Sequence, residues 1–196
     1  PATILAAATE PLTTTQHGPI RGYVDQSIFA FKGVPYGGDT ALRRFKAPVP
    51  PDPWTDVRTC TEFGPMAIQP KGYNSGSKSG PGSVQSEDCL RLNVWTPALR
   101  DGQKRPVLVY FHGGAYNGGT VNSDLYDGVR LCKKGDVVVV TVNHRLNGFG
   151  FLFLGDLGFA LKSFGRWLRF ARRRLAATPR SIAGNRKERL THRSSE

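Results

Sequence analysis

The chain has 196 residues, which is enough for one domain with a sizeable core and marginal for two. Hydrophobic residues make up 39% and charged residues 21% of it, so its composition favours a globular chain over a disordered one. No apolar run approaches the roughly 18 residues that a membrane-spanning helix needs, and no cluster of His and Cys residues has the spacing of a metal site. We therefore expect no membrane span, no metal and no cofactor.

The net charge of +12 is unevenly distributed along the chain. Residues 159–196 contain 11 of the 27 Lys and Arg residues but only two of the 15 Asp and Glu residues. The part of the chain before them is close to neutral, which argues against a nucleic-acid-binding surface over the whole protein. We expect no specific nucleic-acid partner, and the basic segment needs an explanation of its own.

Residues 1–17 are rich in Ala and Thr, and we expect them to form a flexible N-terminus. Within them, Ile4–Ala8 has the apolar and small residues found at the end of a secretory signal peptide. The alternative is an ordinary flexible terminus. A secreted or periplasmic location and a cytoplasmic one both stay open.

The first elements predicted along the chain are short strands. Ile20–Val24 and Ile28–Lys32 are β-type runs on either side of a short turn, which predicts a hairpin. Gly33–Pro53 contains repeated Gly and Pro residues and is expected to be a loop. Gly72–Gly82 is rich in Ser, Gly and Lys, so we expect an exposed loop there too. Leu90–Trp95 alternates loosely between apolar and polar residues, as an outer strand of a sheet does.

Two later runs have a different character. Val107–Phe111 and Val137–Val142 are continuous apolar segments rich in β-branched residues, a pattern typical of buried parallel strands. Between them, Asp124–Lys133 is a plausible short helix. Strand, helix and strand make a crossover unit, which predicts the α/β class. Together with the antiparallel strands expected earlier in the chain, this predicts a mixed, mostly parallel sheet.

The segment His112-Gly113-Gly114-Ala115 follows the first of these apolar runs. Glycines at the end of a buried strand let backbone N–H groups turn toward a ligand without a Cβ in the way. In ester hydrolysis such N–H groups stabilise the negative charge on the tetrahedral intermediate, and the loss of one donor typically costs about 3–4 kcal/mol of barrier. The same pattern occurs in lipases and esterases. The alternative is a Gly-rich turn that binds no ligand.

Residues 18–158 resemble the type-B carboxylesterase/lipase family, which includes the cholinesterases. Five segments match in the expected order, so coincidence is a poor explanation. Besides the loop at His112, they are Phe31–Tyr36, Arg44–Pro48 with Pro53-Trp54, Ser86–Trp95 and Asn143–Phe151. The resemblance implies a truncated α/β-hydrolase fold, a serine-esterase mechanism through an acyl-enzyme, and a small-molecule carboxylic ester as substrate. Oligomeric state and the natural ester stay open.

The same resemblance implies roles for individual residues. Gly114 and Ala115 correspond to the residues whose N–H groups form the oxyanion hole, on a loop that begins at His112 and Gly113. Cys60 and Cys89 match the family's first disulfide; the alternative is two free cysteines in a reducing cytosol.

Arg44 and Glu87 correspond to a structural salt bridge of the family. It ties the Pro-rich loop to the Ser86–Trp95 segment.

The nucleophile that this loop serves is missing from the sequence. In the family the serine lies in Gly-x-Ser-x-Gly on a tight strand-to-helix turn. The nearest stretch, Gly76–Gly80, has Lys78 at the centre and precedes the oxyanion loop, whereas the family order is loop, serine, acid, histidine. We assign no nucleophile, acid or base to this chain and expect it to be inactive on its own.

After residue 158 the resemblance stops and the basic segment begins. Leu161, Phe164, Leu168 and Leu175 fall on one helical face, which predicts an amphipathic basic helix. One hypothesis is a frameshifted or truncated gene product, since out-of-frame reading produces Arg-rich sequence of this kind. The alternative is a non-catalytic remnant whose basic segment binds an anionic membrane or nucleic acid.

Overall fold

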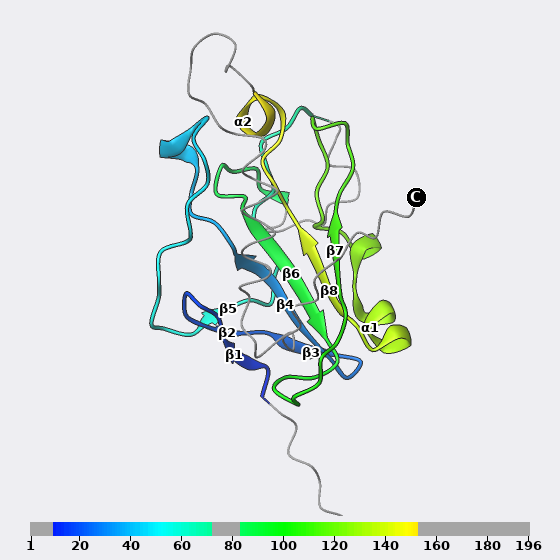
Figure 1. Ribbon diagram of the computed structural model, residues 1–196. Coiled ribbons are helices and arrows are strands. Elements are labelled where there is room, and N and C mark those ends of the chain that lie inside the picture. The colour runs from blue at the N-terminus through cyan, green and yellow to red at the C-terminus, as the bar shows by residue number, and fades with distance from the viewer. Residues whose placement is uncertain (1–9, 72–82, 153–196) are drawn as a thin grey trace, which may run out of the picture.

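The computed structural model describes residues 10–71 and 83–152 (Figure 1). The signal-like run Ile4–Ala8, the loop expected over residues 72–82 and the basic segment 159–196 lie outside the described residues. Among the helices that are described, none has the length and apolar character needed to cross a bilayer.

The described strands form two sheets. The smaller sheet has the order β1-β2-β5 and the larger one the order β3-β4-β6-β8-β7. The strands are β1 (Leu12–Thr14), β2 (Pro19–Arg21), β3 (Tyr23–Asp25), β4 (Ile28–Pro35), β5 (Arg58–Thr59), β6 (Arg91–Thr96), β7 (Val107–Phe111) and β8 (Val138–Val142). The helices are the 3-10 turns η1 (Ala41–Arg43) and η3 (Asp124–Tyr126) and the α-helices α1 (Val129–Gly135) and α2 (Asn147–Phe151).

The predicted hairpin is confirmed, with β3 antiparallel to β4. Its turn residues Gln26 and Ser27 have φ of 47° and 69°, the pair of left-handed residues that a tight type I′ turn requires. The run expected as one strand over 20–24 is divided at Gly22, where only glycine fits because a Cβ would lie 2.2 Å from the Ala30 carbonyl oxygen. Its first half joins the smaller sheet instead.

Two expected boundaries differ from the structure. The flexible N-terminus expected over residues 1–17 includes β1, whose residues pair antiparallel with β2 and so gain backbone hydrogen bonds. The loop expected over Gly33–Pro53 starts later, since β4 runs to Pro35, and it contains η1.

The prediction that residues 90–95 form an outer strand is wrong. β6 lies in the middle of the larger sheet, antiparallel to β4 on one side and to β8 on the other. Its polar residue Asn93 is 2% exposed because both ends of its amide are satisfied: Oδ1 accepts from the Gly33 N–H at 2.9 Å and Nδ2 donates to Thr141 Oγ1 at 3.0 Å. A buried hydrogen-bonded amide produced the alternation that suggested an exposed face.

The predicted crossover is confirmed: β7 and β8 are parallel and are joined through α1. The sheet is mixed, as expected, although antiparallel pairs outnumber this parallel pair among its described strands. β7 itself was expected to be buried. It is the last strand in the sheet order, and Val107 and Leu108 are 42% and 48% exposed.

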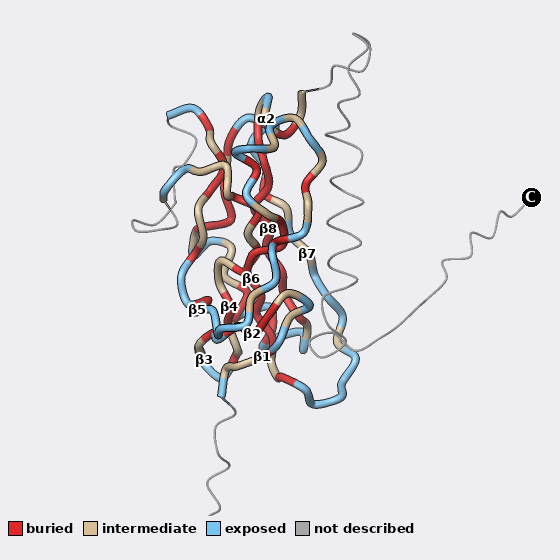
Figure 2. Tube along the Cα trace, turned by 90° about the vertical axis from the view of Figure 1, so that its left-hand side faces the viewer, coloured by how far each residue is buried: buried red, intermediate tan, exposed pale blue. Residues whose placement is uncertain are grey.

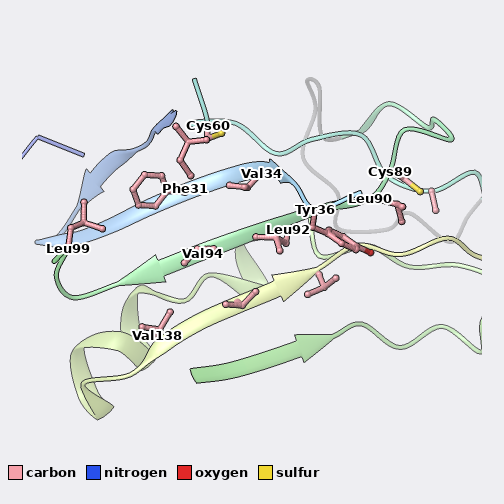
Figure 3. Packing of buried hydrophobic residues seen from close by; sticks show 14 of the residues in the cluster. Phe31, Val34, Tyr36, Cys60, Cys89, Leu90, Leu92, Val94, Leu99 and Val138 are labelled. Atoms are coloured by element: carbon pink, nitrogen blue, oxygen red, sulfur yellow. The ribbon is translucent and has the colours of Figure 1, made fainter. Parts of the chain in front are cut away.

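The core lies on both faces of the larger sheet. Figure 2 shows the buried residues running through the middle of the sheet, with the exposed ones in the surrounding loops. The main cluster, away from α1, contains Phe31, Leu92, Val94, Val138 and Val140 (Figure 3). A smaller cluster beneath α1 contains Ile28, Ala30, Trp95, Val129, Cys132 and Val139. Together they fix the relative positions of β7 and β8, whose ends carry the site.

Candidate functional site

The candidate site lies at the carboxyl ends of β7 and β8. Both strands point toward the end of the sheet that carries α2 (Figure 1). His112 directly follows β7, and Asn143-His144-Arg145 directly follows β8. Because the two strands are parallel neighbours, these two segments emerge side by side at one edge, which is where open α/β sheets bind ligands.

The loop after His112 is a tight turn. Gly114 has φ of 126°, and a Cβ at this residue would lie 1.9 Å from the Gly118 carbonyl oxygen. Its carbonyl oxygen accepts from the N–H groups of Asn117 and Gly118 at 3.0 and 3.1 Å. Ala115 and Tyr116 have φ of 51° and 63°, a left-handed conformation that costs about 1 kcal/mol or more for each non-glycine residue. The surroundings must hold the loop in place.

Two residues, Gln69 and Asn147, hold the far side of this loop. Gln69 is 6% exposed; its Oε1 accepts from the Gly119 N–H at 2.8 Å and its Nε2 donates to the Gly119 carbonyl at 3.1 Å. Asn147, at the start of α2, donates its backbone N–H to the Tyr116 carbonyl at 2.7 Å and its Nδ2 to the Ile68 carbonyl at 2.8 Å. The loop is therefore tied to the segment around residue 68.

A buried network centred on Asn143 holds the chain that follows the loop. Asn143 Oδ1 accepts from Thr120 Oγ1 at 3.1 Å and from the Val121 N–H at 3.0 Å. Its Nδ2 donates to Asn122 Oδ1 at 2.9 Å, and its carbonyl oxygen accepts from the Tyr36 hydroxyl at 2.7 Å. Neither Gln69 nor this network was identified from the sequence, because single Asn and Gln residues carry no spacing signal.

The two histidines of the site form a stacked pair. The rings of His112 and His144 lie 4.4 Å apart, centre to centre, with 5° between their planes. Each residue is 7% exposed. Burial and, to a smaller extent, the nearby His144 together lower the pKa of His112 to about 4, while the Gly113 backbone acts in the opposite direction. Burial also lowers the pKa of His144. Both rings are neutral at pH 7.

The chemistry available to the loop is hydrogen-bond donation. Residues 113–117 are exposed. No described residue accepts a hydrogen bond from the N–H of Gly114 or Ala115. Within the part of the chain that the structure describes, these two N–H groups have no acceptor, which is the state that donation to a ligand oxygen requires. Over residues 10–71 and 83–152, no three His, Cys, Asp or Glu side chains form a group that could hold a metal ion.

The disulfide expected between Cys60 and Cys89 is not formed; both are buried free cysteines. The Cys60 carbonyl accepts from the Lys32 N–H, whereas Leu90, next to Cys89, accepts from the Tyr36 N–H. Four residues along β4 correspond to about 13 Å, well beyond the reach of a disulfide, and Figure 3 shows the two sulfurs far apart. Burial raises the pKa of the Cys60 thiol to about 11 and that of Cys89 to about 12.

Arg44 and Glu87 come together as the sequence suggested. Arg44 Nε donates to both carboxylate oxygens of Glu87, at 2.8 and 3.0 Å. Thr40, just before η1, also donates its hydroxyl to the Glu87 carbonyl at 2.7 Å. These bonds tie the loop that follows β4 to the segment that precedes β6. None of these bonds reaches the loop at His112.

A mixed sheet with a glycine-rich loop after β7 is the arrangement of the α/β hydrolases, and comparison with known proteins gives the same class. The chain belongs to the carboxylesterase family, whose model matches residues 9–160. The para-nitrobenzyl esterase of Bacillus subtilis (strain 168) is 40% identical over 153 residues, covering 78% of this chain and 31% of the relative. Acetylcholinesterase-1 of Trittame loki is 40% identical over 151 residues, covering 72% of this chain and 27% of the relative.

Solved structures give the same result. A carboxylesterase of Geobacillus stearothermophilus superposes with a TM-score of 0.77 at 40% identity, covering 89% of this chain and 36% of that one. An esterase of Clostridium hathewayi, described as able to hydrolyse aliphatic aromatic polyesters, superposes with a TM-score of 0.74 at 31% identity, covering 89% and 36%. The chain thus spans about a third of the length of these relatives, and its fold is the corresponding part of an α/β hydrolase.

Proposed function

We propose that this chain carries the oxyanion-binding part of a serine carboxylic ester hydrolase and does not turn over esters by itself. The observation that carries the proposal is the loop at the end of β7, where Gly114 and Ala115 have positive φ and N–H groups from which no described residue accepts a hydrogen bond. The printed sequence has no Gly-x-Ser-x-Gly to supply the nucleophile. Membership of the carboxylesterase family supports the reaction class.

The chemistry follows from the charge that develops during acyl transfer. When a nucleophile adds to an ester carbonyl, the carbonyl oxygen becomes an oxyanion. Two fixed N–H groups stabilise that charge without reorganising, which is where most of the catalytic gain in such sites arises. Gln69 and Asn147 keep the loop fixed. The proposed substrate is a small-molecule carboxylic ester that reacts through an acyl-enzyme once a serine is supplied.

The oxyanion site can be tested with a stable tetrahedral anion, p-nitrophenyl methylphosphonate. We expect it to shift the amide ¹H–¹⁵N signals of Gly114 and Ala115 saturably, with a dissociation constant in the millimolar range that is ordinary for a few hydrogen bonds. Gly114→Ala should abolish the shifts, because its Cβ would lie 1.9 Å from the Gly118 carbonyl oxygen. Gly113→Ala is the matched control, since a Cβ there has no atom within 4 Å.

Shifts spread evenly over the exposed loops, or equal shifts in the two variants, would count against an oxyanion site. Catalysis is tested separately. Hydrolysis of p-nitrophenyl acetate should not exceed the rate in buffer, and a fluorophosphonate probe should not label the chain. Stoichiometric labelling of a serine would show that a nucleophile is present and would overturn the expected inactivity.

A further inference from the structure

We infer that His144 is a positioning residue for the oxyanion loop, and that the stacked pair it forms with His112 holds the loop while both rings are neutral and releases it when the pair takes up a proton. This inference rests on the proposed function, because it concerns the same loop. The histidine pair lies where the loop leaves β7, whereas the N–H donors belong to Gly114 and Ala115 further along the loop.

The pair joins the ends of two strands. His112 is the first residue after β7 and His144 the second after β8, and their rings lie 4.4 Å apart in parallel planes. His144 Nδ1 is 2.9 Å from the Arg145 carbonyl oxygen, and the backbone of His112 lies on the other side of the same ring. A neutral imidazole has one N–H, so it donates to one of these two backbone groups at a time. The His144 side chain therefore connects the turn after β8 with the first residue of the loop.

The stack continues on both sides of the pair. On the His112 side lies Gly119, where a Cβ would be 2.5 Å from His112 Nδ1, so the end of the loop packs directly on this ring. On the other side, Phe151 of α2 meets His144 edge-on at 6.0 Å, and Tyr116 of the loop packs on Phe151 at 4.7 Å. The pair is thus enclosed by the start, middle and end of the loop and by α2.

A proton on this pair is unfavourable for two reasons. Both rings are buried, and an imidazolium there loses hydration; this effect on the pKa outweighs the neighbouring backbone groups, which favour the protonated rings. Each ring is also the other's nearest titratable neighbour, so a charge on one opposes a charge on the other. The Arg145 guanidinium donates to the Lys46 carbonyl instead, Tyr116 packs on Phe151, and among residues 10–71 and 83–152 no carboxylate contributes to the pKa of either ring. Protonation therefore favours an arrangement in which the rings separate.

Amide hydrogen exchange of the whole chain tests this inference. The reporters are Gly118, whose N–H donates to Gly114, and Gly119, whose N–H donates to Gln69. With the pKa of His112 at about 4 in place and at its ordinary 6.5 when released, loop protection should fall about 70-fold between pH 8 and pH 4.5, after correction for intrinsic exchange. Protection in the central strands β6 and β8 should fall much less.

His144→Phe keeps a ring in the stack but removes the titrating group and its hydrogen bond to the Arg145 carbonyl. We expect several-fold lower protection of Gly118 and Gly119 at pH 7 and a shallower fall with acid. His17→Phe, the same change at a histidine far from the loop, should leave both unchanged. Wild-type protection and pH profile in His144→Phe would overturn the inference.

A second measurement does not depend on how the variant folds. In the wild-type chain, ring proton signals of both histidines should titrate below pH 6.5, each step shifting the other ring's signals. Two independent titrations near pH 6.5 would refute the paired arrangement. If the phosphonate fails to bind while loop exchange follows the pair, the proposed function fails and the positioning role stands.

Discussion

Asn143→Ala is the sharpest test of how the site is held. Asn143 is 2% exposed, and its side chain satisfies the Thr120 hydroxyl, the Val121 N–H and the Asn122 amide oxygen. Truncation removes this partner from each of the three groups, and an unsatisfied buried polar group costs about 1–3 kcal/mol. The hydroxyl can rotate toward another acceptor, but the other two groups are fixed. We expect a loss of about 4 kcal/mol, a large part of the 5–15 kcal/mol of a typical domain.

Urea denaturation followed by tryptophan fluorescence measures this loss. With m near 2 kcal/mol/M, the midpoint should fall by about 2 M. Asn117→Ala is the matched control, because Asn117 is exposed and contributes its backbone N–H to the loop, which the substitution keeps. It should change stability by less than about 0.5 kcal/mol. A loss below about 1 kcal/mol in Asn143→Ala would refute the view that this network holds the strand ends together.

Three further predictions concern pH, thiols and the loop. The pKa of His112 is about 4 in the folded chain against an ordinary 6.5. Its contribution to the free energy of unfolding is therefore complete above pH 6.5, and up to about 3 kcal/mol of it is lost as the pH falls toward 4. Urea midpoints at several pH values should show this loss in the wild type and not in His112→Phe; parallel curves would contradict it. With Cys60 and Cys89 free and buried, Ellman's reagent should find all three thiols in urea without reductant, and few in the native chain at pH 8; one thiol in urea would indicate a disulfide. Gln69→Ala should speed amide exchange in the loop at least tenfold, whereas Gln103→Ala, at an exposed residue, should not. Equal exchange rates in the two variants would show that Gln69 does not hold the loop.

Local patterns were sufficient for the parts of the fold that depend on local rules. The Gln26–Ser27 turn and the crossover formed by β7, α1 and β8 follow from turn chemistry and from runs of β-branched residues. The position of β6 does not, because Asn93 is buried through hydrogen bonds to residues far along the chain. Alternation alone cannot distinguish a satisfied buried amide from an exposed one.

The sequence likewise predicted one part of the candidate site and missed another. The loop at Gly114 and Ala115 was recognisable because glycine spacing reflects a backbone requirement that is local. Gln69 and Asn143 were missed because their roles depend on which segments fold against each other. The expected disulfide failed for a related reason: the presence of two cysteines says nothing about the separation that β4 imposes between Cys60 and Cys89.

The exposed position of β7 also bears on how this chain behaves in concentrated solution. Val107–Phe111 is a run of five uncharged β-formers without proline or glycine, the composition that stacks into intermolecular sheets. Among the described strands it is paired on one edge only. Arg105 and Pro106 precede it and act as gatekeepers at one end, but Gly113 and Gly114 at the other end offer no such protection. Refolding yield should therefore fall with protein concentration, and a charged residue at Leu108, 48% exposed, should restore it.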